Sequence, residues 1–251
     1  MNLHNDSNTL TRWLAPSSQT SLNVKEVIVW RVLVDQAQAA TYWPLLSQDE
    51  QARAQRFHFA KDRKVFVVAR GVLRLLISRY LPANPASITF SKTEFGKPFL
   101  PDSSLHFNLS HSGNIVLLAF ARDIELGVDV EQYKPLPDLA DIAQNFFSAQ
   151  EQTALFSLPI SEQQAAFFRL WSRKEAFIKE RGEGLSHPLD SFDVSLSAEN
   201  PQLLATRKSA IDVVDYTIQA LNVEDGYESA VAITRADWHF KFYNWEEETM
   251  Q

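Results

Sequence analysis

The sequence predicts a mixed α+β protein that is built from two similar lobes. One observation is an internal repeat: residues 65–77 (VFVVARGVLRLLI) align with residues 166–178 (AFFRLWSRKEAFI), apolar on apolar at most positions. A second is that residues 115–122 resemble residues 229–235 in the same order along the chain. Chance similarity between amphipathic helices is the alternative explanation. Because ligand sites favour interfaces between such units, a duplication would place the site between the lobes.

The first half contains the pattern of a strand, two helices and further short strands. Residues 1–23 are polar and aperiodic, so we expect a loose N-terminal arm. The β-branched run at 24–34 predicts a buried strand. The helical spacing of apolar residues and the terminal Leu81-Pro82 predict the helices that follow. These helices span 47–57 and 61–80, and the strands after them span 87–91, 105–109, 114–121 and 126–131, with a turn at 95–98.

The second half repeats this order after a proline-rich connector at 134–137. The predicted helices are 138–146, 148–156 and 162–181, and the predicted strands are 192–196, 213–221 and 228–234. The sequence is therefore divided into an arm (1–23), an N-terminal α+β lobe (24–125) and a C-terminal α+β lobe (126–251).

Composition limits the class of protein. A chain of 251 residues with 45% apolar content can build two lobes of about 120 residues each. The absence of cysteine excludes disulfides, thiolate metal sites and thiol nucleophiles, and fits a reducing compartment. No secretory signal is visible, and the longest apolar run, 115–121, is far shorter than the roughly 20 residues of a membrane span. We expect a cytoplasmic protein without a membrane partner.

Charge is distributed unevenly along the chain. The net charge is −7, from 24 basic and 31 acidic residues, which argues against nucleic-acid binding. The segment 47–80 nevertheless holds eight basic residues against three acidic ones. This local excess suggests an anion site, although a solvated face of a long helix would look the same.

The segment 127–131 (GVDVE) places two carboxylates on one face of a strand. Side chains alternate along a strand, so burial of Val128 and Val130 would turn Asp129 and Glu131 to the opposite side. Two like charges this close repel unless a proton or a cation lies between them, and Mg²⁺ prefers such oxygen ligands. The alternative is an edge strand with a solvated acidic face.

The segment 171–179 (WSRKEAFIK) places Glu175 and Lys179 one turn apart on a helix. Such a pair is commonly a surface ion pair worth about 0.3–0.5 kcal/mol. The surrounding aromatic and aliphatic residues instead indicate a half-buried glutamate. Glu175 could then be a third metal carboxylate, with Lys174 and Lys179 as phosphate-binding ammonium groups.

The segment 107–113 (FNLSHSG) contains an adjacent serine and histidine. Neighbours on an extended chain point to opposite faces, so Ser110 and His111 cannot easily act as nucleophile and base. A loop with hydroxyls, an imidazole and Gly113 better suits an oxyanion, and the alternative is a turn histidine without a task. The turn Gly96-Lys97-Pro98 is weak in isolation because many β-turns look like it.

Taken together and in order, these segments resemble the Sfp-type 4′-phosphopantetheinyl transferases. The matching segments are 95–98 (FGKP), 107–112 (FNLSHS), 127–131 (GVDVE) and 171–175 (WSRKE) with Lys179, and the extended likeness covers about 47–234. The resemblance implies a pseudo-two-fold pair of lobes with the active site between them. It implies transfer of the phosphopantetheine arm of coenzyme A to a serine of an apo carrier protein, leaving adenosine 3′,5′-bisphosphate.

The resemblance also implies a role for each matching residue. Asp129, Glu131 and Glu175 would hold Mg²⁺, with Mn²⁺ as the alternative, and Glu175 would also serve as the base. Lys174 and Lys179 would neutralise phosphate charge. The remaining coenzyme contacts would come from Asn108, Ser110, His111, Lys97 and Pro98, and from Arg53 at the 3′-phosphate, with Arg63 and Arg70 as second choices.

The implied partners are coenzyme A and an acyl, peptidyl or polyketide carrier protein. A monomer is expected, because one chain supplies both halves of the site. Two other functions remain open from the sequence. One is a non-catalytic protein of the same fold that binds coenzyme A or a carrier, and the other is a metal-dependent phosphodiester hydrolase.

Overall fold

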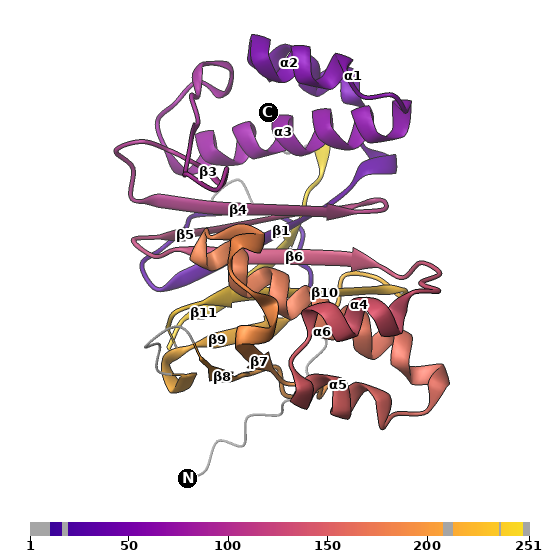
Figure 1. The fold of residues 1–251 in the computed structure, drawn as a ribbon. Coiled ribbons are helices and arrows are strands. Elements are labelled where there is room, and N and C mark those ends of the chain that lie inside the picture. Colours follow the sequence, from indigo (N-terminus) through magenta and orange to yellow (C-terminus); the bar gives the residue numbers. More distant parts are fainter. Residues whose placement is uncertain (1–10, 17–19, 208–212, 236, 248–251) are drawn as a thin grey trace.

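The protein consists of two α+β halves whose sheets pack against each other (Figure 1). The computed structural model describes residues 11–16, 20–207, 213–235 and 237–247. Within them the helices are α1 (Ala39–Tyr42), α2 (Gln48–Gln55), α3 (Ala60–Tyr80), α4 (Leu139–Phe146), α5 (Ala149–Phe156) and α6 (Ile160–Arg181). The strands are β1 (Glu26–Leu33), β2 (Ser91–Lys92), β3 (Pro98–Phe99), β4 (Leu105–Ser112), β5 (Ile115–Arg122), β6 (Leu126–Gln132), β7 (Phe192–Val194), β8 (Leu203–Thr206), β9 (Thr217–Ala220), β10 (Tyr227–Ile233) and β11 (His239–Asn244).

The two halves share one topology. In the first, β1 is followed by helices α2 and α3 and then by β4 and β5, and the sheet order is β11-β1-β5-β4. In the second, β6 is followed by α5 and α6 and then by β9 and β10, and the order is β6-β10-β9. In each half the first strand lies antiparallel beside the last of its three. The predicted α+β fold with a duplicated unit is thereby confirmed.

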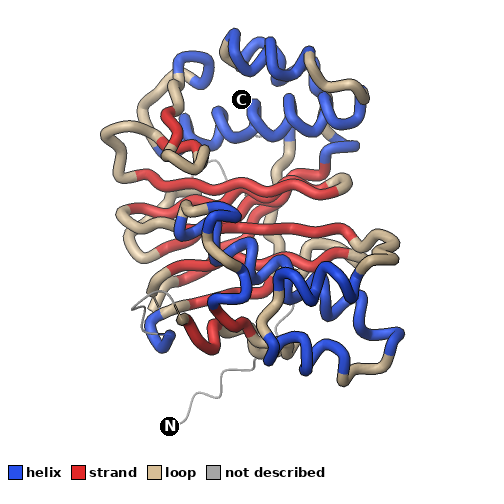
Figure 2. The backbone as a smooth tube through the Cα atoms, in the orientation of Figure 1, coloured by secondary structure: helices blue, strands red, loops and turns tan. Residues whose placement is uncertain are grey.

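The elements form four layers: helix α3, the first sheet, the second sheet and helix α6 (Figure 2). Three apolar clusters fill the spaces between neighbouring layers. Representative members are Ile28, Leu73 and Phe120 under α3; Phe177, Ile218 and Ala230 under α6; and Val29, Leu117 and Val128 between the sheets. Within the described residues, no helix is long and apolar enough to cross a bilayer.

Local helix signals repeat at the same interval as the apolar pattern. Ser47 and Glu50 form a capping box at the start of α2, and Ser148 and Glu151 form one at the start of α5. In each box the serine and the glutamate exchange hydrogen bonds with the backbone of the other residue, which satisfies two unpaired amides of the helix terminus. The two boxes are 101 positions apart, so the duplication extends beyond the long helices.

The last strand was not predicted, and it belongs to the first sheet. β11 runs parallel to β1, and the described part of the N-terminal arm lies against it through a bridge between Leu14 and Tyr243. Trp13 also donates from Nε1 to the carbonyl of Asn222, 2.6 Å away. The arm is therefore attached to the fold at residues 11–16 and is not loose there. The division into lobes at residue 125 stays a prediction. β11 follows that residue in the sequence but belongs to the sheet of the first half.

Two predicted strands are shorter in the structure because turns replace their beginnings. In place of the strand at 87–91, a 3₁₀ turn covers Pro85–Ser87, where the Asn84 side chain accepts from the amide of Ala86. The strand at 213–221 is confined to β9, because Val213–Asp215 also forms a 3₁₀ turn. Neither change alters the strand order that positions the site.

Gly127 allows α6 to approach β6 closely. A Cβ atom at this position would lie 2.0 Å from the carbonyl oxygen of Ala176 and 2.4 Å from the amide nitrogen of Glu180. No real Cβ contact is that short, so any side chain would push the helix away from the strand. The glycine thus fixes the height of Glu175 and Lys179 above the strand.

We predict that Gly127→Ala lowers the free energy of unfolding by about 2–3 kcal/mol, because the helix backbone must shift. Urea denaturation monitored by circular dichroism measures this loss. Gly226→Ala is the matched control. Its Cβ would meet nothing within 4 Å, and its φ of +82° leaves only the backbone cost of about 1–2 kcal/mol. An equal or smaller loss for Gly127→Ala would contradict the close-approach argument.

Candidate active site

Two carboxylates of β6 face helix α6. Val128 and Val130 lie in the core between the sheets, so Asp129 and Glu131 take the opposite face, as predicted. Asp129 is buried, with 3% of its surface exposed, and Glu131 is half-buried. The alternative of a solvated acidic strand face is therefore wrong for Asp129.

Lys179 of α6 binds the carboxylate of Asp129. Its Nζ lies 2.5 Å from Asp129 Oδ1, 3.0 Å from Ser110 Oγ and 3.3 Å from the carbonyl oxygen of Val128. Glu175 is half-buried one helical turn earlier. The salt bridge of Lys179 thus goes to the strand, in place of the surface pair with Glu175 that the spacing alone allowed.

Negative charge is concentrated around Glu175. Burial raises the pKa of Glu175 to about 7; the carboxylates of Asp129 and Glu131 add to this rise, and Lys179 partly offsets it. Burial and the charge of Asp129 also raise the pKa of Glu131. In addition, Asp129 Oδ2 is buried without a hydrogen-bond partner. Carboxylates arranged in this way favour a cation or a proton between them.

The chemistry of these donors fits a hard divalent cation. Carboxylate oxygens are ligands that Mg²⁺ and Mn²⁺ prefer, and Asp129 Oδ2 has unused lone pairs. In the described part of the chain, no three acidic, histidine or cysteine side chains are already gathered into a metal site. Ion binding would therefore require the carboxylates to move closer together.

Strand β4 meets β6 through side chains, because the two strands belong to separate sheets. Three side-chain oxygens of β4 accept hydrogen bonds from three amides of β6. The pairs are Asn108 with Val128 (2.9 Å), Ser110 with Val130 (3.4 Å) and Ser112 with Gln132 (3.0 Å). Asn108 and Ser110 are also buried. Asn108 and Ser110 thus join the two sheets, and their contact with the coenzyme stays a prediction.

His111 points away from this junction. It is exposed and lines a cavity on the other side of β4, whereas Ser110 donates its hydroxyl proton to Asp129. Adjacent strand residues thus face opposite ways, as predicted, and no serine–histidine pair of a hydrolase forms here.

The cavity beside His111 is basic. It has a volume of about 580 Å³ and lies between α2, α3 and the β2–β3 hairpin. Its lining includes Arg53, Arg56, Lys92, Phe66, Pro98 and His111. Of the predicted coenzyme residues, Arg53, Pro98 and His111 are thus brought together around one cavity.

The arginines of α2 and α3 differ in their availability for an anion. Arg70 and Arg74 lie beside the cavity, but both bind the buried carboxylate of Glu50, at 2.6 and 2.8 Å. Arg53 is exposed, and its guanidinium carbon lies 5.2 Å from the ring centre of Phe66. The structure therefore favours Arg53 over Arg70 as an anion ligand.

For three further basic residues, the structure differs from the predicted set of coenzyme ligands. Arg63 lines a separate cavity with Lys64, so it is not grouped with Arg53. Arg56 and Lys92 line the basic cavity, although sequence reasoning did not select them. Arg56 belongs to the basic segment 47–80, which indicated an anion site. Lys92 lies outside that segment, and only the position of the β2–β3 hairpin brings it to the cavity.

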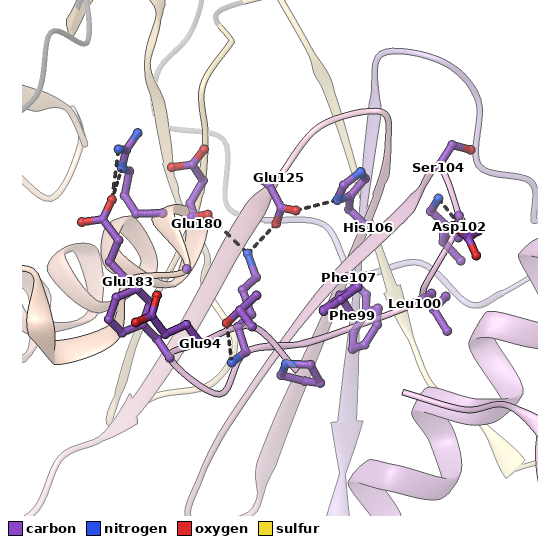
Figure 3. A pocket seen from close by; sticks show the side chains of 18 residues that line it. Glu94, Phe99, Leu100, Asp102, Ser104, His106, Phe107, Glu125, Glu180 and Glu183 are labelled. Atoms are coloured by element: carbon purple, nitrogen blue, oxygen red, sulfur yellow. Dashed lines mark hydrogen bonds and ion pairs between the residues drawn. The ribbon is translucent and has the colours of Figure 1, made fainter. Parts of the chain in front are cut away.

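Lys97 lines a neighbouring cavity of about 840 Å³. Its Nζ lies 2.6 Å from Glu125 and also donates to the carbonyls of Leu126 and Glu180. Figure 3 shows Glu125 linked on its other side to His106, 2.8 Å away. The ammonium of Lys97 thus connects the β2–β3 hairpin to β6 and to the end of α6, and it does not face the basic cavity.

Lys174 also lies away from the predicted site. It is fully buried, and its Nζ binds Glu151 at 2.8 Å and the carbonyls of Leu189 and Phe192 at 2.7 Å each. The expectation that Lys174 neutralises phosphate charge is therefore corrected. Its ammonium supports the core of the second half.

Comparison with known proteins matches both halves of the chain. Residues 125–232 match the 4′-phosphopantetheinyl transferase superfamily, and residues 29–122 match the family described as 4′-phosphopantetheinyl transferase, N-terminal. The 4′-phosphopantetheinyl transferase HetI of Nostoc sp. is 35% identical over 93% of this chain and 98% of its own.

Two relatives from Bacillus subtilis give the same result. The 4′-phosphopantetheinyl transferase ffp is 37% identical, covering 77% of this chain and 84% of its own, and Sfp is 34% identical, covering 82% and 89%. The solved holo-[acyl-carrier-protein] synthase (AcpS) of Thermotoga maritima is 20% identical with a TM-score of 0.36, covering 45% of this chain and 64% of its own. Both halves of the chain match family models, and three relatives that are 34–37% identical align with most of its length. This chain therefore belongs to the 4′-phosphopantetheinyl transferase superfamily.

Proposed function

We propose that the chain transfers the 4′-phosphopantetheine group of coenzyme A to a serine of an apo carrier protein and releases adenosine 3′,5′-bisphosphate. The observations that carry this proposal are the group of interacting carboxylates Asp129, Glu131 and Glu175 and the basic cavity on the other side of β4. Relatives 34–37% identical over most of the chain are named for this transfer. The acceptor class, acyl, peptidyl or polyketide carrier, is left to experiment.

The basic cavity supplies the coenzyme site. One guanidinium group can donate two parallel hydrogen bonds to two oxygens of a phosphate. Arg53 and Arg56 present two such groups at the cavity. Arg53 is our assignment for the 3′-phosphate. His111 and Pro98 line the same cavity and would contact the nucleotide.

Asp129, Glu131 and Glu175 would hold the divalent cation, Mg²⁺ or Mn²⁺. When bound, such an ion neutralises charge on the pyrophosphate oxygens. The buried Oδ2 of Asp129, which lacks a partner, supports this assignment. Lys179 adds a fixed positive charge next to the same carboxylate.

The residues of the chain also account for the proton and the leaving group. The serine Oγ of the carrier forms a bond to the β-phosphorus, and the bond from that phosphorus to the bridging oxygen breaks. The serine proton passes to Glu175, directly or through water, because an ionised carboxylate can accept a proton as a general base. Lys179 stabilises the charge that develops on the departing bisphosphate.

We predict that the wild-type chain with coenzyme A and Mg²⁺ increases the mass of an apo carrier by about 340 Da, the mass of the arm. Glu175→Gln should slow this transfer by about 10²–10⁴-fold, because the amide cannot accept the serine proton. Intact-protein mass spectrometry over time gives both rates.

Glu162→Gln is the control for that experiment, since Glu162 is an exposed glutamate in the first turn of the same helix. It should transfer at the wild-type rate. A Glu175→Gln variant with wild-type rate at saturating Mg²⁺ would exclude Glu175 as the base. Coenzyme binding without mass gain across a panel of carriers would favour a non-catalytic binding protein.

We predict that Arg53→Ala raises the KM for coenzyme A by about 10- to 100-fold, the usual cost of losing a charged hydrogen bond. With 3′-dephospho-coenzyme A as the donor, wild type and Arg53→Ala should have similar KM values, because the phosphate that Arg53 binds is missing. Steady-state kinetics with both donors tests the assignment.

Arg63→Ala, from the separate cavity, serves as the matched arginine control and should leave both KM values unchanged. If Arg53→Ala weakened both donors equally, Arg53 would act on another part of the coenzyme or on the fold.

A further inference from the structure

The junction of β4 and β6 has a regular geometry. Both are edge strands, and the acceptors at 108, 110 and 112 contact the amides at 128, 130 and 132 with a constant offset of 20 positions. Alternate residues of a strand repeat about every 6.6 Å, so side chains at every second position of β4 meet every second amide of β6. The side chains stand in for the carbonyls of a missing backbone ladder.

Ser110 has a second partner on β6. A hydroxyl offers one proton and two lone pairs. Ser110 donates to Asp129 Oδ1, 2.8 Å away, and accepts from the amide of Val130 and from Lys179 Nζ. Its hydrogen-bonding capacity is fully used, and the direction of each bond is determined, since the amide and the ammonium can only donate.

Ser112 repeats this arrangement two residues later. It accepts from the amide of Gln132 and donates to Glu131 Oε2, 3.2 Å away. Each serine therefore binds the carboxylate of one β6 residue and the amide of the next. Asn108 differs, because its side-chain oxygen accepts from the amide of Val128 and no carboxylate precedes that amide, where the chain has Gly127.

We infer that Ser110 and Ser112 are positioning residues that orient the carboxylates of Asp129 and Glu131 for cation binding. Each hydroxyl engages one oxygen of its carboxylate and leaves the other oxygen to a ligand, and in Asp129 that other oxygen is the buried Oδ2 without a partner. This inference rests on the cation site of the proposed function. It assigns a task to two side chains that need not touch either substrate.

The test is a titration of the full chain with Mn²⁺ in the absence of coenzyme and carrier. Electron paramagnetic resonance measures the free Mn²⁺ and hence the affinity. Removal of groups that orient metal ligands typically weakens metal affinity about 10- to 100-fold, which is the loss expected for Ser110→Ala. Ser112→Ala should also weaken Mn²⁺ binding and is the safer variant to fold, because Ser112 is half-buried. Ser110→Thr keeps the hydroxyl and should recover most of the affinity.

Asn108→Ala is the matched control. It removes one contact of the same junction without touching a carboxylate, so its thermal stability should fall as in Ser110→Ala while its Mn²⁺ affinity stays within about twofold of wild type. Equal Mn²⁺ affinities for Ser110→Ala, Ser112→Ala and wild type would overturn the inference and leave only a role in joining the sheets. So would an equal loss of affinity in Asn108→Ala.

The outcome is separable from that of the proposed reaction. A wild-type chain that binds Mn²⁺ but modifies no carrier would refute the transfer, and the serine variants would still decide the positioning role. A wild-type chain that binds no Mn²⁺ at millimolar concentration would overturn the positioning role, whatever the carrier assay gives.

Discussion

The burial of Asp129 is the constraint on which the rest of the site depends. A carboxylate out of contact with water requires a positive charge and hydrogen-bond donors, or it takes up a proton. Here Lys179 comes from α6 and the Ser110 hydroxyl from β4, so one side chain ties three elements and both sheets together. Gly127 makes this possible because it lets α6 come close enough to the strand.

The duplicated halves use one helix position in opposite ways. In the first half, Arg74 binds the buried capping glutamate Glu50. The position 101 residues later is Glu175, and the partner of the equivalent glutamate, Glu151, is Lys174 instead. Moving the structural cation by one residue turns it toward the core and leaves position 175 to face β6. The repeat thus keeps its buried ion pair while one copy gains an acidic site.

Short-range periodicity predicted the relative placement of the acidic side chains. Alternation on a strand placed Asp129 and Glu131 on one face, and helical spacing placed Glu175 and Lys179 on another that meets it. It failed for Lys174, because successive helix residues point about 100° apart and apolar neighbours on all sides hid which direction faces the core. Periodicity could not reveal the partners of Asn108 and Ser110, because those partners lie on β6, an edge strand of the other sheet. It also could not reveal that Arg70 forms a salt bridge with Glu50.

The pairing of β11 with β1 in the first sheet affects how the protein folds during its synthesis. β1 leaves the ribosome before its parallel neighbour β11, which lies more than 200 positions later, and Leu14 forms a bridge with that later strand. Pairings of such sequence separation close last, because the loop between them must be ordered first. The first sheet therefore keeps an open edge until β11 has been synthesised, and an isolated first half would expose that edge to other chains.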